Sequence, residues 1–319
     1  MNSTLLSQSH IDLHPHAHLC DYTTFHLGGP CRLLITCQNP QQLEATVTGL
    51  INSNEEFILM GGGSNLVVSD HGLDCAVIRY LSRSPLIHRE GMDLIVSGST
   101  LLDHLVEFAL EQSLEGVNYA SGIPGTVGGA IVGNAGAFGR QVGDHLRSVC
   151  LFTKDGVKKE VDPSSLGFRY RHSNLKETGD IVLGARFAMT AGEQGKLQAE
   201  RQQILETRRQ KHPNLQTHPC AGSFFRNIEP TSKAERRQAA GWFLEQAGVK
   251  TLCVGGAVIF EKHANIIIKR DCCKAQDVYD LSLLMAKAVK EKFGIDLVRE
   301  VRLVGRFPGM PEKINQLIW

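Results

Sequence analysis

The segment from Ser121 to Gly139 constrains the fold of this chain more than any other part of its sequence. It holds seven glycines within the eighteen residues 122–139, together with small apolar residues and no charged ones. This glycine content is too high for a helix or a regular strand. Such a backbone is tolerated mainly where it wraps a flat or phosphorylated ligand. The sequence therefore predicts a ligand-binding loop over residues 122–136.

A second glycine-rich loop, Gly61-Gly-Gly-Ser-Asn65, follows the apolar run 57–60, which is typical of a buried strand. Three glycines let main-chain N–H groups approach an anion, and Ser64 and Asn65 add side-chain donors. The loop is not a P-loop, because no Lys-Ser/Thr pair follows, and no helix pattern follows as in a GxGxxG fingerprint. Taken alone, it fits either an anion-binding loop or a tight turn between strands.

Composition and charge exclude several classes of protein. With 42% apolar and 21% charged residues, the 319-residue chain is typical of a globular protein of two or three domains. Its formal net charge of +1 argues against binding to nucleic acid or to a membrane surface, and no apolar run approaches the roughly 20 residues that cross a bilayer. Nine cysteines without a CxxC pair are typical of reduced thiols in the cytoplasm.

Residues 1–18 are expected to form a flexible leader. They are polar, have no basic-then-apolar signal pattern, and contain His10, His14, His16 and His18 around Pro15. A metal site needs ligands held in fixed geometry, which a flexible segment does not supply. No metal is therefore expected.

Strands and helices are expected to alternate along most of the chain. Short apolar runs predict strands at 57–60, 66–68, 75–78, 94–97, 147–153, 181–189 and 266–268. Helical spacing of apolar residues, or a polar stretch without prolines, predicts helices at 42–51, 101–112, 192–212 and 277–293. The helix at 192–212 is expected to be exposed and to link two domains.

The last third of the chain is expected to form a separate domain. A capping box, Ser232 with Glu235, predicts a helix that runs to a stop at Gly248. Residues 295–304 alternate between apolar and polar and predict a closing strand, with Glu300 on the face opposite the apolar side chains.

Four motifs together resemble those of the UDP-N-acetylenolpyruvoylglucosamine reductase family, a family of flavoenzymes. They follow one another from about Thr23 to Gly305, over nearly the whole chain: Thr23-Thr-Phe-His-Leu-Gly-Gly29, Gly61-Gly-Gly-Ser-Asn-Leu66, Gly122-Ile-Pro-Gly-Thr-Val-Gly-Gly-Ala130 and Asn134-Ala-Gly-Ala137. The segment between Arg171 and Ser223 has no room for the tyrosine-bearing loop of the longer subtype. The chain therefore resembles the shorter, type II form.

The resemblance implies an α+β fold with a two-part FAD-binding domain of the vanillyl-alcohol-oxidase (PCMH) type and a C-terminal α+β substrate domain. The expected limits are a leader at 1–18, FAD-binding subdomains at 19–80 and 81–198, and a substrate-binding domain at 199–319. FAD would be tightly but not covalently bound. The implied cofactor-binding residues are Gly61, Gly62, Gly63, Ser64, Asn65, Leu66, Ser121, Gly122, Ile123, Pro124, Gly125, Thr126, Gly128, Gly129, Asn134, Ala135 and Gly136.

The resemblance also implies three catalytic residues. Arg171, in Tyr170-Arg-His-Ser173, has a planar fork suited to a carboxylate and to a developing enolate. Ser223, in Ala221-Gly-Ser-Phe-Phe-Arg-Asn227, matches the family's proton donor, and Glu300 matches the carboxylate expected to assist the enolate. Outside these motifs the same residues would be interpreted as a surface arginine, a turn serine and an exposed strand carboxylate.

Further residues are implied as substrate contacts, and some depart from the family pattern. The expected contacts are Tyr170, Arg208, Lys211, Arg226, Asn227 and His263. His263 fits a structural role equally well, and a solvated helix face competes for at least one of the basic residues. The departures from the family pattern affect peripheral substrate contacts. Arg226 stands where the family usually has Lys, Val298 where it has Glu, Lys269 where it has Asn, Phe138 where it has Tyr, and His172 where it has Asp.

The activity implied by the family is the NADPH-dependent reduction of the UDP-N-acetylglucosamine enolpyruvyl ether to UDP-N-acetylmuramate, in the cytoplasm and by a monomer. This reaction belongs to peptidoglycan precursor synthesis, and hence to cell wall biogenesis, cell shape and cell division. One alternative is a flavin oxidase that passes electrons from an alcohol or sugar to oxygen. Another is a flavin-binding scaffold with an inactive site.

Overall fold

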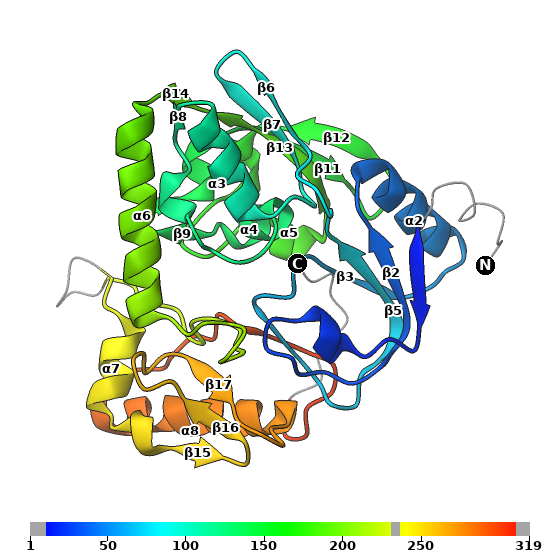
Figure 1. The fold of residues 1–319 in the computed structure, drawn as a ribbon. Helices are drawn as coiled ribbons and strands as arrows, with labels where there is room; N and C mark the ends of the chain where they lie inside the picture. Colours follow the sequence, from blue (N-terminus) through cyan, green and yellow to red (C-terminus); the bar gives the residue numbers. More distant parts are fainter. Residues whose placement is uncertain (1–10, 231–236, 311–319) are drawn as a thin grey trace.

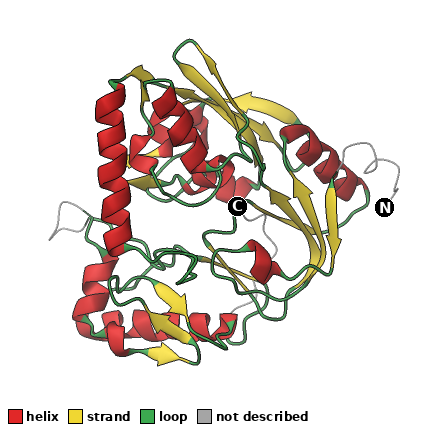
Figure 2. Ribbon diagram, viewed as in Figure 1, coloured by secondary structure: helices red, strands yellow, loops and turns green. Residues whose placement is uncertain are grey.

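The computed structural model describes residues 11–230 and 237–310, which form the expected α+β fold in three units (Figures 1 and 2). A four-stranded sheet builds the first unit and a five-stranded sheet the second. The long helix α6 (Gln194–Lys211) runs past the second unit toward the third, which holds a three-stranded sheet and two helices (Figure 1). Within the described ranges, no helix is long and apolar enough to span a bilayer.

The first unit is a sheet in the order β1-β2-β5-β3, with β5 parallel to both β2 and β3. Helix α2 (Pro40–Asn52) packs its buried Leu43, Val47 and Leu50 on this sheet. Its first turn is capped by the Asn39 side chain, as expected of this residue type. The other elements are β1 (Asp12–Pro15), η1 (Leu19–Tyr22), β2 (Cys31–Cys37), β3 (Phe57–Met60) and β5 (Leu73–Tyr80).

The expected flexible leader at 1–18 is wrong for its described end. Residues Asp12–Pro15 form the edge strand β1, which pairs antiparallel with β2. The side chains of β1 are mostly exposed, so the strand depends on main-chain hydrogen bonds that its polar sequence does not reveal. His10 lies outside the described residues. Among the described residues, no group of three or more His, Cys, Asp or Glu is arranged to hold a metal ion, and all nine cysteines are free thiols.

The second unit is an antiparallel sheet in the order β12-β11-β13-β7-β6, with one face covered by helices. Its main elements are β6 (Ile87–Glu90), β7 (Asp93–Ser97), α3 (Leu102–Glu111), α4 (Val127–Gly133), β11 (Leu146–Phe152), β12 (Lys158–Val161), α5 (Leu175–Thr178) and β13 (Ile181–Ala188). Its short elements are β8 (Leu114–Glu115), η2 (Asn118–Ala120), β9 (Gly136–Ala137), β10 (Arg140–Gln141), η3 (Val142–His145), η4 (Pro163–Leu166) and β14 (Thr190–Ala191).

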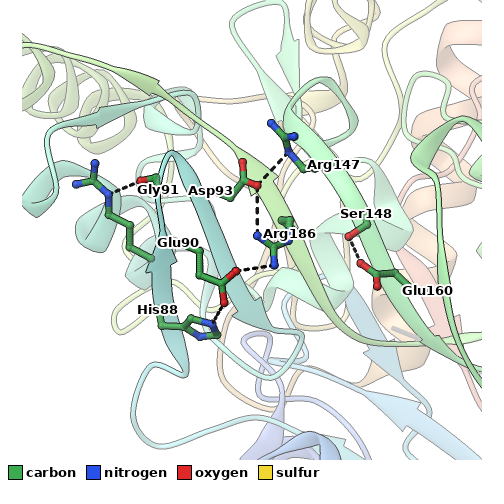
Figure 3. Close-up of polar contacts among 9 residues, drawn as sticks. His88, Glu90, Gly91, Asp93, Arg147, Ser148, Glu160 and Arg186 are labelled. Carbon is green, nitrogen blue, oxygen red and sulfur yellow. Dashed lines mark hydrogen bonds and ion pairs between the residues drawn. The ribbon is translucent and has the colours of Figure 1, made fainter.

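Ion pairs occupy part of this sheet away from its buried core. Arg186 lies between Glu90 and Asp93, at 2.8 and 3.3 Å, and Arg147 contacts Asp93 at 3.1 Å (Figure 3). Exposed pairs of this kind add little stability. This part of the sheet is therefore polar and open to solvent, whereas Ile181 and Leu183 of β13 are buried against α2 of the first unit.

The glycine-rich segment contains a helix, which corrects the prediction that it is too rich in glycine for one. Helix α4 (Val127–Gly133) begins where the Thr126 hydroxyl accepts a hydrogen bond from the N–H of Gly129, and it ends at Asn134 with φ +42°. Val127, Ala130 and Ile131 are buried in the core of the second unit. Burial of these side chains outweighs the low helix propensity of the glycines.

Helix α6 confirms the helix predicted at 192–212, and the domain limit expected at residue 199 falls inside it. Arg201 on α6 pairs with Asp103 on α3 at 2.6 Å and with Glu107 at 2.9 Å. The helix also buries Leu197 in the core of the second unit. At residues 197 and 201, α6 therefore packs on the second unit.

The third unit packs α8 (Ala275–Phe293) and α7 (Ala240–Gln246) against a sheet in the order β15-β16-β17. The predicted capping box at Ser232 and Glu235 lies outside the described residues, but the predicted stop at Gly248 is present, with φ +77°. The remaining elements are η5 (Val249–Thr251), β15 (Cys253–Val254), β16 (Ala257–Ile259) and β17 (Ile267–Lys269).

The closing strand predicted at 295–304 is wrong for most of its length. Only β18 (Arg302–Val304) is a strand. It pairs parallel with β4 (Leu66–Val68), the strand that directly follows the first glycine loop in the sequence. Residues before it make single contacts instead: Val298 O accepts from the N–H of Arg226, and the N–H of Glu300 donates to Phe224 O, both at 2.8 Å. The predicted alternation persists because Val301 and Leu303 are buried, but the ladder partners change along the segment.

Candidate functional site

The two glycine-rich loops lie directly against each other. The Ser64 hydroxyl donates a hydrogen bond to Pro124 O at 3.1 Å. A Cβ atom on Gly61 would lie 2.4 Å from the Thr126 hydroxyl oxygen, and one on Gly125 would lie 2.8 Å from that of Ser64. Glycine is therefore required at both positions because the loops approach too closely for a side chain. The first and second units meet along this contact.

The first loop is suited to an anionic ligand. In the described part of the chain, the main-chain N–H groups of residues 62–65 donate to no protein acceptor. Buried or half-buried N–H groups normally have partners, and a row of free ones in a turn binds phosphate groups well. This arrangement fits the pyrophosphate of FAD, with the free N–H groups as its donors.

The second loop is fixed by a residue that the sequence did not reveal as functional, Asp103 on α3. Its carboxylate accepts a hydrogen bond from the N–H of Gly122 at 2.8 Å and also binds Arg201. Burial acts to raise the pKa of Asp103, but Arg201 and the Gly122 N–H outweigh it and hold the pKa below its usual value. On the other side, a Cβ on Gly122 would lie 3.2 Å from Cδ of Arg208.

Several predicted cofactor residues of the second loop shape the backbone rather than expose polar groups. Ser121 is buried and donates to Asn118 O, and Thr126 caps α4. The buried amide of Asn134 bonds Gln141, Gly143 and Arg169 O. Leu66 and Gly128 are buried, whereas Ile123, Gly129, Ala135 and Gly136 are partly accessible and Pro124 is exposed. These residues form the loop that the sequence predicts, and their contacts with the cofactor stay a prediction.

Arg171 and Glu300 come together from the second and third units. Nε of Arg171 lies 2.9 Å from Oε1 of Glu300 without an aligned hydrogen bond, and Nη2 of Arg171 donates to Gly136 O at 2.8 Å. Burial raises the pKa of Glu300, and the positive charges of Arg171, Arg226 and Lys176 oppose the effect. Arg171 has φ +55°, a strained conformation for a bulky residue that is typical of functional sites.

Lys176, on α5, holds Arg171 in this conformation. Its Nζ donates to Arg171 O at 2.8 Å. The pKa of Lys176 is lowered to about 8, first by burial and then by the positive charges of Arg226 and Arg302, while Glu300 acts in the opposite direction. Lys176 was not predicted as a site residue, although its position three residues after the Tyr170–Ser173 motif was an available signal.

Replacing Lys176 with methionine is expected to lower kcat about 10- to 100-fold, because a displaced Arg171 no longer meets the substrate correctly. The wild type should also lose activity as the pH rises through about 8, where Lys176 loses its charge, and the variant should lack this alkaline limb. Steady-state rates from pH 6 to 10 test both effects. Lys176→Arg should restore much of kcat, and Lys196→Met, on the exposed face of α6, is the control. An unchanged alkaline limb in Lys176→Met would contradict this role.

Ser223 lies in the segment that contacts Glu300. Ser223 forms a bridge with Ile266, and the next residue, Phe224, accepts the N–H of Glu300. Within the described residues, the Ser223 hydroxyl makes no hydrogen bond, so it is free to interact with a ligand. The N-terminal motif reaches the same segment, since the Thr24 hydroxyl donates to Cys220 O at 2.8 Å.

The predicted substrate contacts fall into two groups. Tyr170 and Asn227 meet beside the Arg171–Glu300 pair, where the Asn227 N–H donates to the Tyr170 hydroxyl at 3.3 Å. Nε of Arg226 is buried without a partner, and the charge of Arg226 acts on Glu300. These three residues therefore lie at the candidate site.

The second group lies at the end of α6. The rings of His212 and His263 are 5.5 Å apart, and burial lowers the pKa of both, that of His212 to about 4. Arg208 faces the second loop with Nε buried and unpartnered, whereas Lys211 is exposed. The structure brings Arg208 to the loops and leaves Lys211 on the rim.

Models of two protein families match this chain. A FAD binding domain matches residues 31–162, which include both glycine loops. The C-terminal domain of UDP-N-acetylenolpyruvoylglucosamine reductase matches residues 212–304, which include Ser223, His263 and Glu300.

Similar proteins cover nearly the whole chain. UDP-N-acetylenolpyruvoylglucosamine reductase 1 of Bacillus thuringiensis is 36% identical over 289 residues, which are 90% of this chain and 93% of that protein. The reductase of the same name from Acaryochloris marina is 33% identical over 96% of this chain and 97% of its own length. The crystal structure of the enzyme from Thermus caldophilus superimposes with a TM-score of 0.74 at 29% identity, over 93% of this chain and 99% of that chain.

Proposed function

Because this chain belongs to the UDP-N-acetylenolpyruvoylglucosamine reductase family, we propose that Arg171, Ser223 and Glu300 carry out that family's reaction at the site described above. The chain is a FAD-containing oxidoreductase of peptidoglycan precursor synthesis, a UDP-N-acetylmuramate dehydrogenase. It uses NADPH to reduce the UDP-N-acetylglucosamine enolpyruvyl ether to UDP-N-acetylmuramate. The observation that supports the residue roles is the Arg171–Glu300 pair, formed beside the Ser223 segment by two different units.

The roles of the residues follow from their charges and positions. FAD held by the two glycine loops would supply the redox chemistry, by which hydride from NADPH would reach the enolpyruvyl methylene carbon. The guanidinium of Arg171 binds the conjugated carboxylate and stabilises the charge that develops there. Glu300, already beside Arg171, orients that fork and assists the enolate. Ser223 then donates its proton to the carbon next to the one that received hydride, a step that requires a strongly basic carbon because a hydroxyl is a weak acid.

The binding roles extend this proposal. The first loop (Gly61, Gly62, Gly63, Ser64, Asn65 and Leu66) and the second loop hold FAD tightly without a covalent bond, between subdomains that span about 19–80 and 81–211. Residues from 212 onward belong to the substrate-binding domain. Tyr170, Arg226, Asn227 and Arg208 contact the UDP-sugar, with His263 and Lys211 at its edge. Cationic side chains suit a ligand that carries a diphosphate and a carboxylate.

The chain is further proposed to work as a monomer in the cytoplasm. Its nine free thiols support a reducing compartment. Sedimentation of the FAD-loaded protein should give a species with the mass of one 35.0 kDa chain plus one FAD. A stable larger species would contradict the monomer.

The decisive experiment follows the flavin absorbance through two additions. NADPH should bleach the flavin band of the purified protein, and the UDP-enolpyruvyl sugar, added next without oxygen, should restore it with formation of UDP-N-acetylmuramate. If an alcohol bleached the flavin band in place of NADPH and oxygen then restored it, the result would favour a flavin oxidase. Folded yellow protein that NADPH cannot bleach would favour an inactive scaffold.

A further inference from the structure

Arg79 lies beside the first glycine loop. It is near the end of β5 and pairs in register with Met60, the last residue of β3, so that the loop begins next to it. Together with Gly62 and the N-terminal motif, Arg79 lines a cavity of about 240 Å³. The walls of this cavity include Tyr22, Thr23 and Thr24.

The guanidinium of Arg79 lacks an acidic partner. Within the described residues it makes no hydrogen bond or ion pair, and its Nε is shielded from solvent. Its contact is with the ring of Tyr22, 5.3 Å from the centroid. Asp21 lines the same cavity, but it is exposed and makes a contact with Cys20 instead. A partly buried charge without a counter-charge is costly, and an anionic ligand would offset that cost.

The free N–H groups of the first loop supply the second half of a phosphate site. Residues 62–65 have unpartnered main-chain N–H groups, and Gly62 belongs to the same cavity wall as Arg79. Main-chain donors and a guanidinium fork on one cavity recognise a phosphate more strongly than either alone. Two further arginines near the glycine loops have a buried Nε without a hydrogen bond, but Arg171 lies beside Glu300, and Arg208 faces Gly122 and the charge of Asp103.

We propose that the Arg79 guanidinium binds the pyrophosphate of FAD and is the charged partner of the first glycine loop. This inference rests on the proposed role of that loop. It assigns a cofactor contact to a strand residue outside all of the glycine motifs. Arg79 thereby supplies the positive charge that the loop itself, with no Lys or Arg, lacks.

The test compares Arg79→Met with the wild type in the apoprotein and in the FAD-loaded protein. FAD affinity, measured by flavin fluorescence quenching, should fall about 10- to 100-fold, as expected for loss of a charged hydrogen-bond donor. The affinity for ADP, a probe that carries the pyrophosphate without the flavin, should fall by a similar factor in calorimetry. Both losses should shrink as salt concentration rises, because screening weakens the wild type more. Arg79→Lys should retain part of the affinity.

Thermal melting separates a binding role from a structural one. Methionine keeps the volume of Arg79 and removes an unpaired charge, so the variant apoprotein should melt at or above the wild-type temperature, while its gain on adding FAD should be smaller. Arg83→Met is the matched control, since Arg83 is an exposed arginine paired with Asp12 at 2.9 Å. It should leave both FAD and ADP affinity unchanged.

The remaining outcomes overturn the inference in different ways. Wild-type affinity of Arg79→Met for FAD and ADP would overturn it outright. A loss for FAD but not for ADP would place Arg79 at another part of the cofactor. If Arg79→Met lowered the melting temperature of the apoprotein as much as that of the FAD-loaded protein, the role of Arg79 would be structural. If the wild type itself bound no FAD, the proposed function would fail, which is a separate result.

Discussion

Replacing Ser223 with alanine is expected to slow reduction of the enolpyruvyl substrate about 10²- to 10⁴-fold, the usual contribution of a positioned acid. NADPH should still bleach the flavin at the wild-type rate, because that step requires no proton from Ser223. The hydroxyl has no hydrogen-bond partner in the described protein, so its removal leaves no buried group unsatisfied. The variant should therefore fold and bind FAD normally.

Stopped-flow measurement of the two half-reactions separates these effects. The first, with NADPH alone, reports flavin reduction, and the second, after addition of the UDP-enolpyruvyl sugar, reports substrate reduction. Ser165→Ala, an exposed serine in η4, is the matched control and should leave both rates unchanged. Substrate reduction by Ser223→Ala at the wild-type rate would rule out Ser223 as the proton donor.

Replacing Arg171 with lysine is expected to lower the rate of substrate reduction about 10²- to 10³-fold, the usual cost of losing one donor to a developing negative charge. Lysine keeps the charge but lacks the planar fork that contacts Glu300 and Gly136 at once. It also loses the contact that holds the second loop near Gly136. FAD affinity should change by much less than the rate of substrate reduction.

Single-turnover rates with reduced flavin test this prediction, and Arg169→Lys serves as the control, because Arg169 is an exposed neighbour that contacts His172. A double-mutant cycle with Glu300→Gln tests whether the pair acts as a unit. Since Arg171 and Glu300 are in contact, the double variant should lose less activity than the sum of the two single losses. Strictly additive losses would mean that each residue acts alone.

The local elements followed from the sequence where burial and periodicity agreed. The helices at 42–51, 101–112, 192–212 and 277–293, and the strands at 57–60 and 181–189, are present within about two residues of each end, the usual uncertainty of helix ends. Propensity failed where tertiary packing outweighed it. Helix α4 forms despite its glycines because its small buried side chains fit the core of the second unit.

The edge strand β1 and the pairing of the segment 295–304 were not predictable, because their partners are residues far away in the sequence. The strand β1 is polar and exposed, and its stability depends on main-chain pairing with β2. The segment 295–304 has the alternation of a strand, but its residues pair in turn with the Phe224 segment and with β4. No local pattern encodes a change of partner along one segment.

The sequence by itself determined the chemistry of the site, since glycine content, motif order and the types of Arg171, Ser223 and Glu300 are properties of the chain. Only the tertiary structure decided which groups meet. It placed Nε of Arg171 2.9 Å from Oε1 of Glu300, and it brought Lys176, whose pKa is lowered, into hydrogen-bonding contact with Arg171 O. It also left Arg79 beside the first loop without an ion-pair partner among the described residues. The physical reason is that pKa shifts and unsatisfied charges arise from burial and from contacts between residues far apart in the chain, which packing alone creates.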